Sequence, residues 1–227
     1  MQSKSQAPSI TTGPITAQLM LFFFPILLGT FFQQLYNTVD TIIVGNFVGT
    51  NTALAAVGGA TGQLVNLFVG FFIGLSSGCG VIISQYYGAR DQNAVSKSVH
   101  TALAFSLLSG VVIMVLGLLL TDFSLRAMSL PEEIMPEATA YLHIFFLGMI
   151  PNLFYNMGAA VLRAIGDSKR PLYFLILSCL CNIVLDLIFV AYLRLGVSGA
   201  ALATILSQLA SAVMVLFVLL RTKSGVR

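Results

Sequence analysis

Six long apolar runs, separated by short polar segments, constrain the fold of this chain more than any other feature. They fall at residues 15–45, 52–83, 95–120, 137–162, 171–192 and 198–220. A run of about 20 apolar residues can cross the hydrocarbon core of a bilayer as a helix. Only 8% of the residues are charged and the mean hydropathy is +0.94, whereas soluble domains carry about 25% charged residues. The sequence therefore predicts an all-α, polytopic membrane protein, a bundle of six transmembrane helices.

The short connections leave no room for a soluble domain between the runs. We expect one transmembrane lobe over residues 15–220, a polar N-terminal tail over residues 1–14 and a C-terminal end over residues 221–227. The first two runs have about 30 residues, or about 45 Å as helix, which exceeds a hydrocarbon core of about 30 Å. These helices must tilt or bend, and Pro25 gives the first one a place to bend.

The basic residues gather on one side of this topology. Nine of the eleven Lys and Arg residues fall at the two chain ends and in the connections after the second and fourth runs, and only Arg126 and Arg194 fall on the other side. Because cytoplasmic connections are enriched in Lys and Arg, we expect both termini in the cytoplasm of a multi-pass plasma-membrane protein. Since membrane orientation accounts for the placement of the basic residues, we expect no nucleic-acid partner.

The stretch QQLYNTVDTIIVG, residues 33–45, places a carboxylate, Asp40, near the outer end of the first apolar run. A charge at membrane depth is costly unless it faces a polar cavity, finds a partner or takes up a proton, so its default interpretation is a functional site. On a helix, Gln33, Asn37 and Asp40 form one polar stripe, and Tyr36 lies one turn before Asp40.

A second acid lies at the same depth in the fifth run. Ser178, Asn182 and Asp186 recur every four residues and form another polar stripe. Both runs lead outward, with Asp40 and Asp186 late in each. Two separate segments that bring an acid to the same depth predict a shared polar chamber.

Further polar side chains belong to this inventory of cavity-lining candidates. An alternative is that many of them only form hydrogen bonds between helices, which is common in membranes and contributes about 1 kcal/mol each. The candidates are Gln33, Gln63, Asn66, Asn152, Asn156, Ser178 and Gln208, and Thr204, Ser207 and Ser211 share the face of Gln208.

The residue patterns of catalysis are absent from the sequence. The two histidines, His100 and His143, fall near opposite ends of their runs, so they form no metal cluster and no nucleophile–base pair. No Gly-rich phosphate loop is present. We therefore expect no enzyme and no cofactor. Buried carboxylates with amide and hydroxyl neighbours can instead exchange protons or hold Na⁺.

Several motifs resemble those of the multidrug and toxic compound extrusion (MATE) transporters, in particular the bacterial branch. The resemblance runs from about residue 12 to residue 220. Its motifs are YNTVDTIIVG after Pro25, GAR at Gly88–Arg90, LRAIGDSKRP at Leu162–Pro171, NIVLD at Asn182–Asp186 and GVSGAALATILSQ at Gly196–Gln208. The chain looks like the N-terminal six-helix lobe, and the family pairs two such lobes.

The resemblance implies a cation-coupled (H⁺ or Na⁺) antiporter that exports organic, cationic compounds. It implies that Asp40 and Asp186 bind the coupling cation, which includes a possible Na⁺ site. Tyr36, Asn182 and Thr204 look like the surrounding network, and we add Asn37 from the stripe of Asp40. The expected partners are membrane lipid, small organic cations, and a C-terminal lobe or a second copy, since this chain corresponds to half of such a transporter.

Two other functions stay open at this point. A lipid-linked oligosaccharide flippase of the same superfamily would favour basic residues in the central cavity to meet a pyrophosphate, whereas all Lys and Arg residues here lie in or near connections. A truncated, non-transporting membrane module would insert and associate without moving a substrate.

Overall fold

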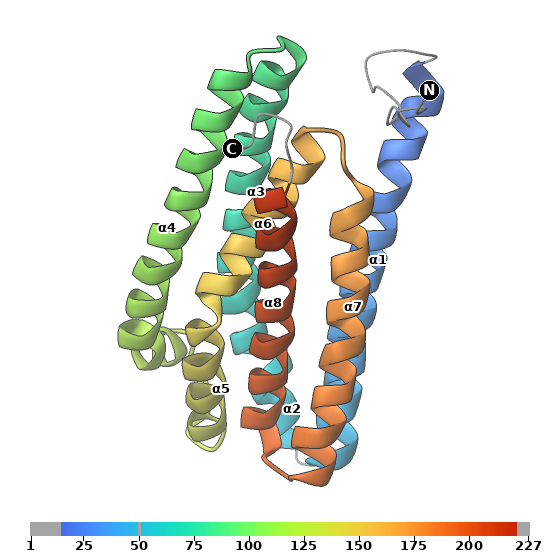
Figure 1. Cartoon of the computed structure of the whole chain (residues 1–227). Coiled ribbons are helices and arrows are strands. Elements are labelled where there is room, and N and C mark those ends of the chain that lie inside the picture. Colours follow the sequence, from blue (N-terminus) through green and yellow to red (C-terminus); the bar gives the residue numbers. More distant parts are fainter. Residues whose placement is uncertain (1–14, 50, 222–227) are drawn as a thin grey trace.

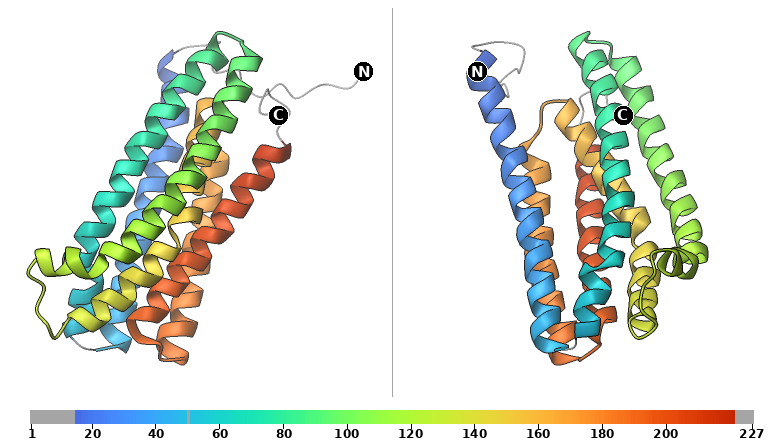
Figure 2. Two further views of the ribbon diagram at one scale, coloured as in Figure 1. Left: turned by 90° about the vertical axis from the view of Figure 1, so that its left-hand side faces the viewer. Right: turned by 180° about the vertical axis from the view of Figure 1, so that it is seen from behind.

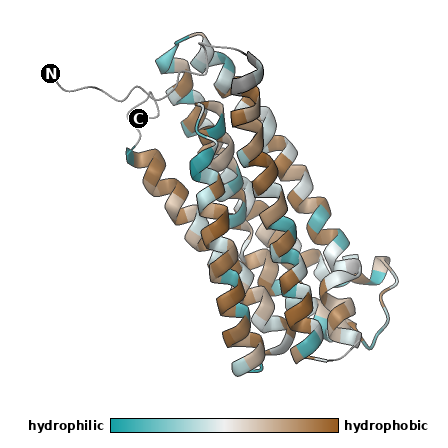
Figure 3. Ribbon diagram, turned by 90° about the vertical axis from the view of Figure 1, so that its right-hand side faces the viewer, coloured by the Kyte–Doolittle hydropathy of each residue, from teal (hydrophilic) through white to brown (hydrophobic). Residues whose placement is uncertain are grey.

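The computed structural model describes residues 15–49 and 51–221, and the regular secondary structure of those residues is entirely helical. Helix is the expected form, since a lipid-embedded segment must satisfy its backbone groups internally. The helices run alongside one another in a bundle (Figure 1), which the side and rear views confirm (Figure 2). Apolar residues cover much of the ribbon (Figure 3). The predicted all-α, polytopic membrane protein is confirmed, while most of the two predicted terminal segments lies outside the described residues.

The second apolar run forms two helices, where the sequence predicts one. Helix α1 covers Ile15–Phe47 without interruption at Pro25, α2 covers Asn51–Gly58, and α3 covers Ala60–Gly88. The break falls at Gly59, whose ψ of −124° is not helical. A Cβ at this position would lie 2.6 Å from the carbonyl oxygen of Ala55, so the sharp turn requires glycine.

The fourth run is also broken: two helices that meet at a bend cover the span predicted over residues 137–162, and together they pass as one bent span. Helix α4 covers Gln92–Ala127, α5 covers Met135–Leu147, and α6 covers Met149–Ala164. The axes of α5 and α6 differ by 49°. Pro151 lies in the first turn of α6 and has no amide to donate to the carbonyl of Leu147, which explains why the helix does not continue straight.

The last part of the chain changes helix type beside Asp186. Helix α7 covers Lys169–Asp186 and continues into η1, a π-helix over Leu187–Tyr192. Gly196, with a φ of +61°, then opens α8, which covers Gly196–Arg221. Helix α7 packs on α1 on one side and on α8 on the other.

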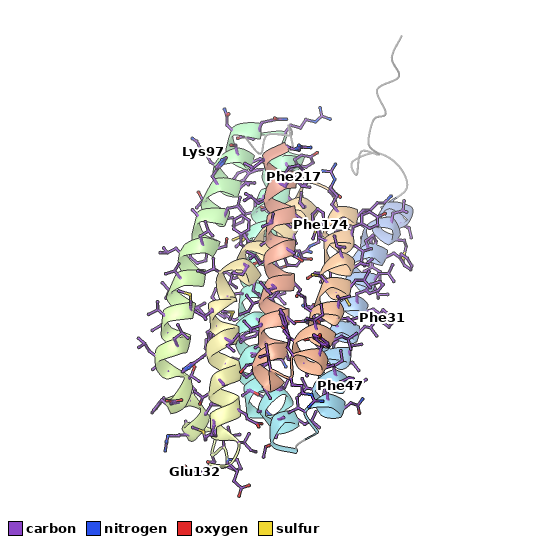
Figure 4. All side chains as sticks on the ribbon, turned by 60° about the horizontal axis from the view of Figure 1, so that its bottom comes forward. Phe31, Phe47, Lys97, Glu132, Phe174 and Phe217 are labelled. Carbon is purple, nitrogen blue, oxygen red and sulfur yellow. The ribbon has the colours of Figure 1, made fainter. Side chains whose placement is uncertain are left out.

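Five described helices or helix pairs are long and apolar enough to cross a membrane, and the number rises to six if α5 and α6 form one bent span. The two ends of the described chain emerge at the same end of the bundle (Figure 1). Lys97 and Glu132 lie at opposite ends (Figure 4). Two apolar clusters form the core, one around Leu142, Met149 and Leu153 and one around Val99, Leu162 and Val215.

Candidate functional site

The structure brings the two intramembrane acids together. Asp40, in the C-terminal half of α1, is 6% exposed, and Asp186, the last residue of α7, is fully buried. Their carboxyl groups are close enough to interact electrostatically. This contact follows from the packing of α1 along α7. Because two ionised carboxylates so close repel each other, the pair is suited to share a proton or a metal cation.

Asn182 completes the buried centre of the site, one helical turn before Asp186. Five polar atoms in this centre have no hydrogen-bond partner in the described protein: Oδ1 of Asp40, both carboxylate oxygens of Asp186, and Oδ1 and Nδ2 of Asn182. Buried polar groups are normally paired, and unpaired ones in a native structure require an explanation. An oxygen-rich centre with unused acceptors is suited to a cation.

Tyr36 and Thr204 lie on the edge of this centre. Their side chains interact with each other, and Tyr36 interacts electrostatically with both acids. The Thr204 hydroxyl also donates to the carbonyl of Ala200, at 3.0 Å. Thr204 therefore bonds back to its own helix and contacts the network at the same time. We call Tyr36, Asp40, Asn182, Asp186 and Thr204 the acid cluster.

Tyr141 is a neighbour of the acid cluster that sequence reasoning missed. It comes from α5, is 6% exposed, and interacts electrostatically with both Asp40 and Asp186. Its ring stacks on that of Phe145, with centroids 6.2 Å apart. Its only sequence signal is a single hydroxyl in an apolar run, one turn after Glu137.

A second polar region lies beside the acid cluster, and we call it the middle pocket. It is a cavity of about 50 Å³ that Tyr36 also lines. Two hydrogen bonds cross it or border it: Asn156 Nδ2 donates to Asn152 Oδ1 at 2.9 Å, and Ser178 Oγ donates to the carbonyl of Ser207 at 2.9 Å. Five of the seven cavity-lining candidates line it, namely Gln33, Asn152, Asn156, Ser178 and Gln208.

Three predicted site residues lie elsewhere. Asn37 is exposed, and its amide donates to Oε1 of Gln34 at 3.4 Å, so the structure does not bring it into the acid cluster. Gln63 and Asn66 are exposed on α3 and do not line the middle pocket. The reason is the helical period: a polar stripe is wide, and only the part of it that faces a neighbouring helix is buried.

The acid cluster offers carboxylate, amide and hydroxyl oxygens, which are the ligands of hard cations. Within residues 15–49 and 51–221, no group of three or more His, Cys, Asp and Glu side chains is arranged to hold a metal ion.

Comparisons with known proteins agree with this geometry. A family model described as MatE matches residues 25–188. The chain is 35% identical to "Probable multidrug resistance protein YpnP" and 35% identical to "Probable multidrug resistance protein YoeA", both of Bacillus subtilis (strain 168). The alignments cover 89% and 96% of this chain, and 45% and 48% of the relatives.

A solved structure, "Crystal structure of MATE in the bent conformation", superposes with a TM-score of 0.85 at 30% identity, covering 92% of this chain and 47% of that one. The chain thus spans about half the length of the relatives it matches. Since the family model covers most of the residues, the chain belongs to the MatE family.

Proposed function

We propose that this chain is one lobe of a cation-coupled exporter of organic cations, and that Asp40 and Asp186 carry the coupling proton or Na⁺. The observation that carries this proposal is the buried contact between two carboxyl groups from different helices. The names of the bacterial relatives, which describe probable multidrug resistance proteins, support the substrate class.

In this mechanism the acid cluster binds and releases a cation and breaks no covalent bond. A cation between Asp40 and Asp186 cancels their repulsion and uses their unpaired oxygens. Asn182 supplies a further oxygen ligand, and Tyr36 and Thr204 hold the edge of the site. Exchange requires the cation and the organic substrate to favour different conformations, or to compete for the same charge.

Polar side chains on the surface of the bundle support the proposal that this chain pairs with a second lobe or a second copy of itself. Helix α1 exposes Gln34, Asn37, Thr38 and Thr41, and α3 exposes Gln63 and Asn66. Polar groups that face lipid are costly, so these faces are suited to a second lobe or a second copy of this chain. A cavity of about 50 Å³ is too small for an organic cation, so the substrate would bind between such halves.

The basic residues support an orientation with both termini in the cytoplasm of a plasma-membrane protein. Arg90, Lys97, Arg163, Lys169, Arg170 and Arg221 all lie on the termini side of the bundle by the order of the helices, and Arg126 and Arg194 lie on the other side. This asymmetry matches the positive-inside rule.

Reconstituted vesicles test the proposal. The full chain is incorporated at protein-to-lipid ratios that allow two copies to pair, and ethidium uptake is driven by an imposed proton or Na⁺ gradient. We expect gradient-driven uptake that Asp40→Asn and Asp186→Asn each abolish. The matched control is Asp122→Asn, which changes an exposed acid that accepts a hydrogen bond from Thr139.

Undiminished uptake by Asp40→Asn would end the proposal. Absence of uptake by a folded chain that still binds a cation would favour the non-transporting module.

A further inference from the structure

A cavity of about 280 Å³ opens at the outer end of the bundle, and neither the fold nor the acid cluster accounts for it. Three segments line it: the end of α1, the first turns of α5, and the connection into α8. All three lie at the lower end of the bundle in Figure 1, away from the chain termini. The lining residues are Val48, Pro136, Glu137, Ala140 and Leu195–Ser198. We call this cavity the outer pocket.

Glu137 is the one charged residue that lines the outer pocket in the described part of the chain. Its carboxylate oxygen Oε2 is buried and has no hydrogen-bond partner among the described residues. The nearest basic residue along the lining segment, Arg194, is exposed and does not line the pocket. The pocket therefore presents a carboxylate with unused acceptor capacity, which suits a cation and opposes an anion.

The outer pocket lies directly outward of the acid cluster along three helices. Glu137 precedes Tyr141 by four residues, Val197 precedes Thr204 by seven, and Val48 follows Asp40 by eight. At 1.5 Å per residue these offsets correspond to about 6 to 12 Å. Offsets of four and seven residues also keep Glu137 and Tyr141, and Val197 and Thr204, on nearly the same helix face. The pocket and the cluster are thus successive layers of one interior.

A thin apolar layer separates the two. Val44 lies one turn outward of Asp40, Ala200 lies one turn outward of Thr204, and both are fully buried. Tyr141 belongs to the same layer and interacts electrostatically with both acids. A cation that moves from Glu137 to the carboxyl pair would cross this layer, in which Ala200 is small and Tyr141 carries a hydroxyl.

We propose that the outer pocket is a waiting site for the monovalent coupling cation, hydronium or Na⁺. From this site the cation moves past Tyr141 to Asp40 and Asp186. The proposal rests on the proposed function, because it assumes that the acid cluster binds a cation. Glu137 concentrates cations at the mouth of the path, as charged clefts do for ionic ligands. Its removal slows arrival and leaves the carboxyl pair itself intact.

Tyrosine fluorescence gives a direct measurement, since the chain has seven Tyr and no Trp. Tyr36 belongs to the acid cluster, and Tyr141 interacts with both of its acids. The purified full chain in micelles is mixed rapidly with NaCl at constant pH, or with acid, at low ionic strength. We expect Glu137→Gln to slow the response about three- to tenfold, with the slowing reduced in concentrated choline chloride, which screens the charge. The matched control, Glu133→Gln, changes an exposed outer acid and keeps the wild-type rate.

The variants separate the two proposals. Equal rates for Glu137→Gln and Glu133→Gln overturn the waiting site. A full response from Asp40→Asn, or no response from the wild-type chain, overturns the proposed function and this inference with it.

A second measurement covers the case in which Glu137→Gln weakens the fold. In a Ser198→Cys variant, we expect a cationic methanethiosulfonate to label the pocket faster than an anionic one of similar size. Adding Glu137→Gln should bring the ratio of the two rates close to one. A ratio near one while Glu137 is present contradicts the waiting site.

Discussion

The acid cluster and the middle pocket are both buried polar regions of the same bundle, and they share Tyr36. They differ in how many of their polar atoms form hydrogen bonds. In the middle pocket, Asn156, Ser178 and Ser207 donate to neighbouring protein oxygens, and the buried hydroxyl of Ser211 has no partner among the described residues. In the acid cluster, five polar atoms have no partner. An unpaired buried polar atom costs about 1–3 kcal/mol. The comparison is what we expect if the middle pocket stabilises the fold and if, as proposed, the acid cluster keeps its acceptors for a cation.

The largest difference between the two regions is expected when one carboxylate of the acid cluster is removed. If the carboxyl pair binds Na⁺, the wild-type chain should gain stability with added NaCl, by about 2.7 kcal/mol at 100 times the dissociation constant. Asp40→Asn and Asp186→Asn should each lose this gain completely, because one carboxylate cannot replace the pair. Thermal unfolding in micelles, with and without NaCl at constant ionic strength, measures the effect.

The corresponding control is Ser211→Ala in the middle pocket, which should keep the full gain. If it loses the gain as well, the two regions act as one site.

Asn182 allows a sharper test, because two consequences of one change have opposite signs. Asn182→Leu replaces two unpaired polar atoms by apolar ones of similar volume, so the cation-free protein should unfold at a higher temperature. The same change removes an oxygen ligand, so the apparent cation affinity should fall about 10- to 100-fold. Titration of the thermal unfolding with NaCl gives both the unfolding temperature without cation and the cation affinity. If both decrease, Asn182 stabilises the fold, as the polar residues of the middle pocket do.

Helices α6 and α8, which both line the middle pocket, pack closely on each other. Gly158 allows this close approach because it has no side chain. A Cβ at Gly158 would overlap Cγ1 of Val215, a stiff β-branched side chain. Gly158→Ala should therefore destabilise the chain by about 1–3 kcal/mol, with little change in cation affinity. Gly74→Ala is the control, since a Cβ there meets no atom within 4 Å and its effect should stay within about 0.5 kcal/mol.

The smallest effect is expected for Ser178→Ala. It removes one interhelical hydrogen bond, of 2.9 Å, to the carbonyl of Ser207. Such bonds contribute about 0.6 kcal/mol on average in membrane proteins, so the melting temperature should fall slightly and the cation response should persist. A large loss of cation affinity in this variant would contradict the separation of the two regions.

The sequence predicts the acid pair because a charge within an apolar run is conspicuous, and its cost does not depend on the details of packing. Tyr141 was missed for the opposite reason, since a tyrosine in an apolar segment is common. Its role becomes visible only when the bend at Gly148 has set the direction of α5.

The same limit explains the other differences. Hydropathy detects a span but not the direction of its axis, so the breaks at Gly59 and Gly148 were not predicted. Asn37 shares a stripe with Asp40, but α1 lies at the edge of the bundle and only part of that stripe is covered.

The π-helix that follows Asp186 predicts a difference in length between this segment and the same segment of some relatives. A π turn closes its hydrogen bond over one more residue than an α turn, as in the bond from the amide of Leu193 to the carbonyl of Ile188. A relative with an ordinary α-helix here should therefore be one residue shorter between the counterparts of Asp186 and Gly196. At this point of the gene, the wider turn can absorb the gain of a single codon, which in a plain α-helix would rotate every later side chain of the segment by about 100°.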